Sequence, residues 1–244
     1  MKTFSMLLPI ALVYSLLGFS ARPHPKPTQP KPADPVTLES VLKRMDETAA
    51  AFHSTQAQFE WDRYEKVIDE VDDVQSGTIY YRRTGTGKDI EMMADITKPD
   101  KKYVLFSEGK IKMYLPKPDQ VTVWDLGKSS SDFESYLVLG FGGSGQDLAK
   151  SFDVTFLGPQ TVEGVSTAEL QLVPKSAKLR NNIAKILLWI DLEKGISVQQ
   201  QFFEPQGDYR LTKYSEVQVN GKKIPDEVFK LKTTGKTQTV SPRG

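Results

Sequence analysis

The chain has 244 residues, of which 39% are hydrophobic and 26% charged, and its formal net charge is +1. This neutral balance of mixed charges argues against nucleic acid as the main partner and against electrostatic attachment to a membrane surface. The absence of cysteine excludes a disulfide framework and lipid attachment at an N-terminal cysteine.

Both ends of the chain differ in composition from the middle. Residues 1–21 combine Lys2, an apolar run over 4–19 and small residues over 18–21, which is the pattern of a secretory signal peptide. An uncleaved single-span anchor is the alternative interpretation of this run. Six prolines in residues 22–35 predict an extended linker, and the polar residues 233–244 predict a disordered tail. The folded domain is therefore expected over residues 36–232.

The domain opens with an amphipathic helix, predicted from Val36 to about Gln58. Its apolar residues recur at helical spacing, and Thr37 is a suitable N-cap. After this helix the apolar period changes to two, as in Ile79 and Tyr81, and turn-forming residues separate the runs. Short strands with tight turns predict an antiparallel meander of about ten to eleven strands. The fold class is thus α+β, mainly antiparallel β.

Residues 131–151 interrupt the strand pattern and predict two short helices around a glycine-rich hinge. Gly140 to Gly145 match G-x-G-x-x-G, but no βαβ unit surrounds them, so no cofactor is predicted. Two histidines and no cysteine leave no convincing metal site. Because no Gly-x-Ser-x-Gly nucleophile motif occurs either, the chain is not expected to be an enzyme.

The inward faces of the predicted strands are rich in aliphatic, aromatic and methionine side chains. Composition alone leaves open whether they form a filled core or a cavity for an apolar ligand, and the small number of helices favours a cavity. Arg83 ends a strand on the same face, either as a rim residue that bonds a carbonyl or as an ordinary exposed arginine. The predicted lipid-contacting residues are Leu42, Met45, Ile79, Tyr81, Arg83, Ile90, Met92, Met113, Leu188 and Phe202.

Several segments together resemble a known protein family. Among them are FHSTQAQF at 52–59, GTIYYRR at 77–83, MYLP at 113–116 and IPDEVF at 224–229. Over residues 38–231 the chain resembles the LolA-type outer-membrane lipoprotein carriers of Gram-negative bacteria. The resemblance implies an unclosed β-barrel with a helical lid over a cavity for acyl chains. It also implies that an arginine in the strand after Gly77 locks the lid. Arg83 matches this position, and Arg82 is the alternative because Thr84 stands where the family usually has proline.

The function expected from this resemblance is that of a monomeric periplasmic carrier. Such a carrier receives acylated lipoproteins or other lipids from an inner-membrane transporter and passes them to an outer-membrane receptor. A sensor or regulatory interaction module of the same fold is the alternative. Neither hypothesis calls for a cofactor, a metal or a nucleic acid.

Overall fold

The computed structural model describes residues 35–84, 89–127, 137 and 139–242, and these build a twelve-stranded sheet with a few helices. The strands lie in the order β12-β6-β5-β4-β3-β2-β1-β11-β10-β9-β8-β7. Neighbours are antiparallel except β12 and β6, which run parallel. Since β12 and β7 end this order, the sheet is open. The predicted unclosed, mainly antiparallel fold is confirmed, with twelve strands instead of ten to eleven.

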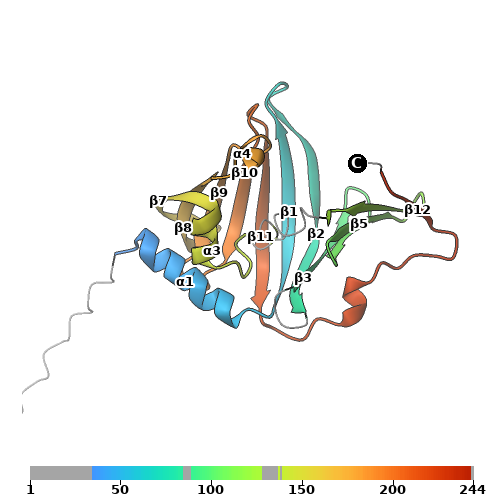
Figure 1. Cartoon of the computed structure of the whole chain (residues 1–244), viewed down its shortest axis with the longest axis horizontal. Coiled ribbons are helices and arrows are strands. Elements are labelled where there is room, and N and C mark those ends of the chain that lie inside the picture. Colours follow the sequence, from blue (N-terminus) through green and yellow to red (C-terminus); the bar gives the residue numbers. More distant parts are fainter. Residues whose placement is uncertain (1–34, 85–88, 128–136, 138, 243–244) are drawn as a thin grey trace, which may run out of the picture. The chain divides into compact units, whose positions relative to one another are not determined.

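The sheet consists of two meanders (Figure 1). Strands β1 to β6 form the first and β7 to β11 the second, and β11 returns to pair with β1. The strands are β1 (Ser54–Glu65), β2 (Glu70–Thr84), β3 (Asp89–Lys98), β4 (Lys102–Ser107), β5 (Lys110–Leu115), β6 (Gln120–Asp125), β7 (Phe152–Val162), β8 (Val165–Pro174), β9 (Lys185–Asp191), β10 (Ser197–Phe203), β11 (Tyr209–Val219) and β12 (Gln238–Val240). The helices are α1 (Leu38–Ala51), α3 (Gly145–Ser151), α4 (Ala177–Arg180) and the 3-10 helix η2 (Asp226–Phe229).

Some predictions concern residues outside the described ranges. They are the signal peptide at 1–21, nearly all of the linker at 22–35, and most of the first helix predicted within 131–151. The second helix of that pair is α3. In the described part of the chain, no helix is long and apolar enough to cross a membrane.

The first helix ends earlier than predicted. It runs over Leu38–Ala51, and Thr37 and Ser40 form a capping box at its start. The prediction that it continues to Gln58 is wrong, because strand β1 already begins at Ser54. The side chain of Asn220 explains the early end. Its amide nitrogen donates to the carbonyl of Ala51, and its amide oxygen accepts from the backbone nitrogens of His53 and Ser54 at 2.7 and 3.1 Å.

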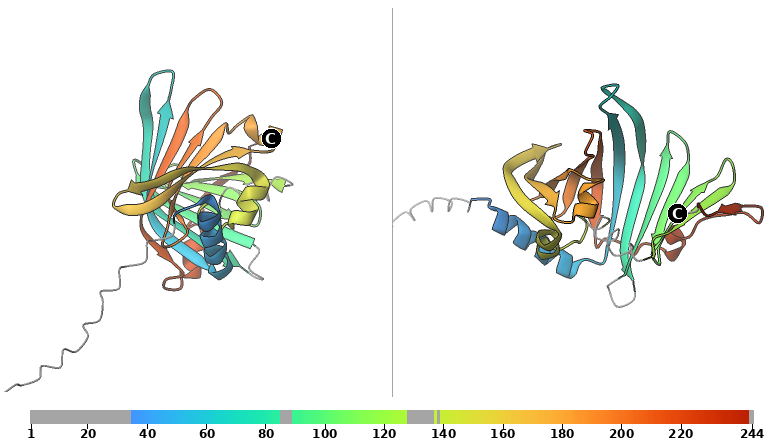
Figure 2. Two further views of the ribbon diagram at one scale, coloured as in Figure 1. Left: turned by 90° about the vertical axis from the view of Figure 1, so that its left-hand side faces the viewer. Right: turned by 45° about the horizontal axis from the view of Figure 1, so that its top comes forward.

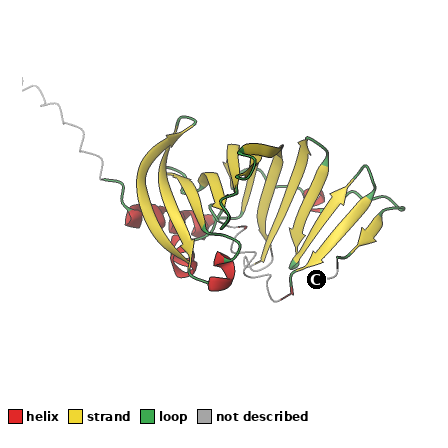
Figure 3. Cartoon of the chain, turned by 90° about the horizontal axis from the view of Figure 1, so that it is seen from above, coloured by secondary structure: helices red, strands yellow, loops and turns green. Residues whose placement is uncertain are grey.

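Helices cover one face of the sheet, which we call the inner face (Figures 1 and 3). In the half formed by β7–β9, α1 and α3 pack Met45 and Leu148 against Leu170 and Leu188, and all four side chains are buried. A second cluster continues along the inner face over β1–β4. On the opposite face, η2 places Phe229 in a smaller cluster on β3 and β4.

The C-terminal segment is ordered where the sequence predicts a disordered tail. Gln238–Val240 forms strand β12 beside β6. The hydroxyls of Thr234 and Thr237 both donate to the carboxylate of Asp119, the latter at 2.6 Å. These hydrogen bonds hold the carboxylate in its charged form and lower the pKa of Asp119. Side-chain hydrogen bonds, which hydrophobic periodicity does not reveal, therefore fix this segment.

Candidate functional site

An apolar pocket of about 280 Å³ opens on the inner face of the sheet. Trp61, Thr212 and Gln200 stand side by side across β1, β11 and β10 and form its floor. Four aromatic side chains from β2, β10 and β11 contribute to its walls: Tyr81, Phe202, Phe203 and Tyr214. The lining residues are Trp61, Tyr81, Leu137, Asn182, Ile183, Gln200, Phe202, Phe203, Glu204, Arg210, Thr212 and Tyr214.

The loop of residues 139–142, which we call the plug loop, lies beside this pocket. Its Phe141 is 1% exposed. The ring stacks on Tyr81 with centroids 5.2 Å apart, and it meets the ring of Tyr214 edge to face at 4.5 Å. Both tyrosines also line the pocket. Phe141 therefore fills the inner face next to the pocket with a side chain that comes from a loop and not from the sheet.

Three backbone carbonyls of the plug loop accept hydrogen bonds from the sheet. The carbonyl of Leu139 accepts from Nε2 of Gln200, and that of Gly140 accepts from the backbone nitrogen of Ser197 at 2.8 Å. The carbonyl of Gly142 accepts from Nη2 of Arg83 at 2.8 Å. Each such bond contributes about 0.5–1.5 kcal/mol net, so these three bonds between described residues together contribute a few kcal/mol.

Two glycines allow the plug loop to approach the sheet this closely. Gly140 and Gly142 have φ of +82° and +88°, a region that disfavours residues with a side chain. A Cβ added at Gly140 would lie 2.2 Å from Cβ of Ser197, and one at Gly142 would lie 2.5 Å from the ring of Phe52. The glycine-rich motif is thus explained by close packing and turn geometry.

The two neighbouring arginines have separate places. Arg83 reaches the plug loop on the inner face, and its guanidinium lies 5.7 Å from the ring of Phe52. Arg82 contacts Asp226 and Glu91, and its guanidinium lies 4.1 Å from the centre of the Phe229 ring. Arg82 therefore holds η2 on the opposite face of the sheet, whereas Arg83 contacts the plug loop.

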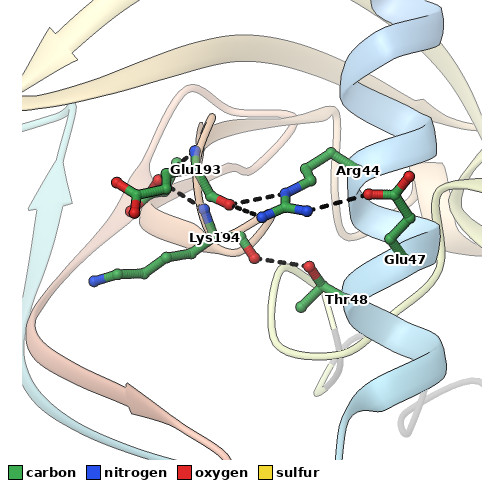
Figure 4. A network of polar contacts seen from close by, with 6 residues as sticks. Arg44, Glu47, Thr48, Glu193 and Lys194 are labelled. Atoms are coloured by element: carbon green, nitrogen blue, oxygen red, sulfur yellow. Dashed lines mark hydrogen bonds and ion pairs between the residues drawn. The ribbon is translucent and has the colours of Figure 1, made fainter.

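Helix α1 is fixed to the turn between β9 and β10 (Figure 4). The guanidinium of Arg44 donates to the carbonyl of Glu193, with Nε at 2.8 Å, and the hydroxyl of Thr48 donates to the carbonyl of Lys194 at 2.7 Å. Gly195 fits beneath the helix, since a Cβ there would lie 2.6 Å from Oγ1 of Thr48. These contacts make α1 part of the wall of the inner face.

The structure places the ten predicted lipid-contacting residues in four different settings. Tyr81 and Phe202 line the pocket, and Arg83 contacts the plug loop. Six are packed within the inner-face clusters: Leu42, Met45, Ile79, Ile90, Met92 and Leu188. Met113 is half-buried and lies on the inner face opposite Val104.

Sequence reasoning missed several pocket residues. Trp61 lies in the alternating run at 59–64, so its periodicity was available as a signal. Gln200 shares a strand face with Val198 and Phe202 by alternation, but it is polar and was therefore not predicted as a contact residue; it is 5% exposed. Phe141 sits between two glycines, and a large aromatic residue in such a loop is a usable signal for a buried contact.

Two tyrosines contribute uncharged hydroxyl groups to the pocket. Burial raises the pKa of Tyr81 and of Tyr214, so both phenols stay protonated at neutral pH. The hydroxyl of Tyr214 lies 3.5 Å from Oε1 of Gln200. Over the described residues, no three or more His, Cys, Asp or Glu side chains gather as a metal site would require. Besides the aromatic side chains and the uncharged Gln200 and Thr212, the lining contains Glu204 and Arg210, which form an ion pair with each other. Such a lining suits an apolar chain that carries a polar group such as an ester or amide.

No protein-family model and no curated protein matches the sequence. Solved structures share the fold at low identity. MucB is 14% identical with a TM-score of 0.52; the match covers 80% of this chain and 63% of that one, so this chain spans less than two thirds of its length. An uncharacterized conserved protein from Thermus thermophilus is 11% identical with a TM-score of 0.52, covering 84% and 98%. The LolA superfamily protein NE2245 from Nitrosomonas europaea is 14% identical, with a TM-score of 0.39 and coverage of 80% and 98%. At such identities the likeness to the first two concerns the fold alone.

Proposed function

We propose that this protein is a periplasmic carrier that binds an acyl chain of a lipid or lipoprotein on the inner face of its sheet. The observation that best supports this proposal is the position of Phe141. It occupies apolar space that is continuous with the walls of the pocket, yet it belongs to a loop held by few hydrogen bonds. A ligand that enters the pocket can take the place of this side chain.

The energies of the two occupants are comparable, which suits reversible binding. Removing a buried phenylalanine from its packing costs about 3–5 kcal/mol. Moving an acyl chain out of water yields about 0.8 kcal/mol per methylene, so about six buried methylenes offset the displacement of Phe141. A longer chain binds with net stabilisation, and an acceptor can still remove it. Gln200 and Thr212 provide neutral hydrogen-bonding groups for an ester near the chain.

A matched pair of tryptophan variants tests the proposal. Trp61 lines the pocket, whereas Trp189 is similarly half-buried on β9 but alternates with the inward Leu188 and Ile190, so it faces away. The affinity for a dansyl-labelled undecanoic acid is measured by fluorescence titration. We expect Trp61→Gln to weaken it about tenfold or more through lost apolar contact, and Trp189→Gln to leave it unchanged. Equal effects of both variants, or no uptake by the wild type, would refute the pocket assignment.

Native mass spectrometry of the protein purified without detergent identifies the cargo. An added mass of a diacylated or triacylated lipoprotein, or of a phospholipid, supports the carrier and defines the lipid class. Transfer of that lipid to acceptor vesicles or to an acceptor protein distinguishes carriage from sensing. A protein that binds lipid but never releases it would favour the sensor.

A further inference from the structure

The turn of the β1–β2 hairpin exposes an unusual concentration of aliphatic side chains. The described residues include six large hydrophobic side chains that are clearly exposed, and four of them lie within residues 67–74. Val67 is 94% exposed and Ile68 53%, both in the turn, and Val71 and Val74 follow on β2 at 47% and 49%. In Figures 1 and 2 this hairpin extends beyond the ends of the neighbouring strands. Exposed aliphatic residues gathered at one projecting point mark a contact surface.

Aromatic and polar contacts connect the base of the hairpin to the neighbouring strands. Tyr64 stacks on Tyr209 of β11 with ring centroids 4.6 Å apart, and Tyr209 contacts Phe203 of β10 at 5.6 Å. The backbone nitrogen of Lys66 donates to the carboxylate of Asp208 at 2.9 Å. The exposed pair at the turn therefore rests on a row of aromatic rings that crosses three strands.

The pocket and the turn lie toward the same end of the sheet. Strand β1 carries Trp61 in the pocket floor and leads directly to Val67, roughly 20 Å further along at strand spacing. Glu204, which lines the pocket, begins the β10–β11 turn, and that turn contacts the base of the hairpin through Asp208. An object that binds the hairpin turn is thus close to the pocket opening.

The charge of the hairpin indicates which kind of lipid surface it can approach. Residues 62–75 contain six acidic and two basic residues, so the segment is strongly acidic. An anionic lipid surface would repel this segment. A zwitterionic headgroup carries an ammonium group outside its phosphate. If only the turn is inserted, carboxylates such as those of Glu70 and Asp72 would lie at the depth of these ammonium groups.

We propose that Val67 and Ile68 insert shallowly into a zwitterionic lipid surface and so bring the pocket to the bilayer. This inference rests on the proposed function, because it supplies the route of an acyl chain into the pocket. A chain that passes from the bilayer to a pocket held nearby is exposed to less water than a chain that diffuses freely, which lowers the cost of transfer.

Vesicle co-sedimentation of the full chain tests the insertion. The probe vesicles contain phosphatidylcholine and phosphatidylethanolamine, with or without phosphatidylglycerol. We expect the double variant Val67→Ser, Ile68→Ser to lower the vesicle-bound fraction about tenfold or more, since both apolar side chains are lost. The matched control is Leu157→Ser on edge strand β7, where the leucine is 47% exposed. It should bind like the wild type, and replacement of both turn residues by leucine should restore binding.

Several results would overturn the inference. They are absence of wild-type binding to zwitterionic vesicles, equal binding of the double variant, or binding that strengthens as phosphatidylglycerol is added. Uptake of dansyl-undecanoic acid from solution, which needs no bilayer, separates this inference from the proposed function. A double variant that takes up the probe normally but no longer binds vesicles supports both. A wild type that binds vesicles through the turn but takes up no probe supports insertion and refutes the carrier.

Discussion

Replacement of Phe141 by alanine should change two quantities in opposite directions: the free energy of unfolding should fall, and the affinity for an acyl chain should rise. The side chain is almost fully buried and packs against Tyr81 and Tyr214. Large-to-small changes of buried phenylalanine cost about 3–5 kcal/mol, and the two aromatic contacts place this site well within that range. We therefore expect the free energy of unfolding of Phe141→Ala to fall by about 3–5 kcal/mol, measured by urea denaturation at neutral pH.

The same change should strengthen binding of an acyl chain. If binding occurs as proposed, a ligand of the wild type must displace Phe141, so the cost of displacement reduces the apparent affinity. If about 3 kcal/mol of that cost disappears, the affinity for dansyl-undecanoic acid rises about a hundredfold. Fluorescence titration of both proteins at a temperature where both are folded gives this ratio.

A second buried phenylalanine provides the control. Phe106 is 0% exposed and belongs to the same inner-face cluster, but it lies on strand β4 and not in the plug loop. Phe106→Ala should lose comparable stability without a gain in affinity. If Phe141→Ala is folded yet binds the probe no better than Phe106→Ala, then Phe141 is ordinary core and the reasoning about the plug loop is wrong.

Other variants probe the contacts around the plug loop. Arg83→Gln removes the bond to the loop carbonyl and should speed probe uptake and amide exchange at 139–148, measured by stopped flow and mass spectrometry; unchanged rates would count against a lock. Gly142→Ala should destabilise by about 1–3 kcal/mol more than Gly164→Ala, because both have positive φ but only the first meets a ring; equal melting temperatures would contradict this. Thr48→Val should lower the melting temperature without changing probe affinity, since Thr48 holds α1 and not the loop. Asp119, whose pKa is lowered on folding, stabilises the C-terminal segment above its unfolded pKa of about 4, and this is lost as pH falls through the lower folded value. Proteolysis of that segment should increase only below about pH 4, and should be insensitive to acid in Asp119→Asn.

Local patterns in the sequence predict most of this fold. Alternation identifies the inner faces of the strands, as with Ile79 and Tyr81, because a half-buried strand repeats every two residues. Helical spacing and the cap at Thr37 locate the start of α1. The end of α1 is not predictable in this way. Asn220, 169 residues from Ala51, supplies the polar group that terminates the helix, and no local window contains both.

The candidate site is predicted less completely than the fold, for the same reason. Tyr81 and Phe202 follow from strand alternation. Gln200 lies on the same strand face as Phe202, but only the pairing of β10 with β9 and β11 places this polar side chain beside Leu188 and Thr212. The burial of Phe141 depends on Tyr81 of β2 and Tyr214 of β11, which are far apart in the sequence and both contact its ring. Long-range strand pairing, which the sequence does not display, thus selects the pocket residues.

The described contacts also indicate which element moves when a ligand enters. Helix α1 buries Val41 and Met45 in a large cluster and is bonded to the β9–β10 turn through Arg44 and Thr48. Displacing it would expose that cluster, at about 25 cal/mol for each Å² of apolar surface, in addition to breaking the bonds. The plug loop buries mainly Leu139 and Phe141 and is held by a few neutral or singly charged hydrogen bonds. Local opening follows the segments with the fewest buried contacts, so if a ligand binds as proposed, we expect the loop to open while α1 remains in place.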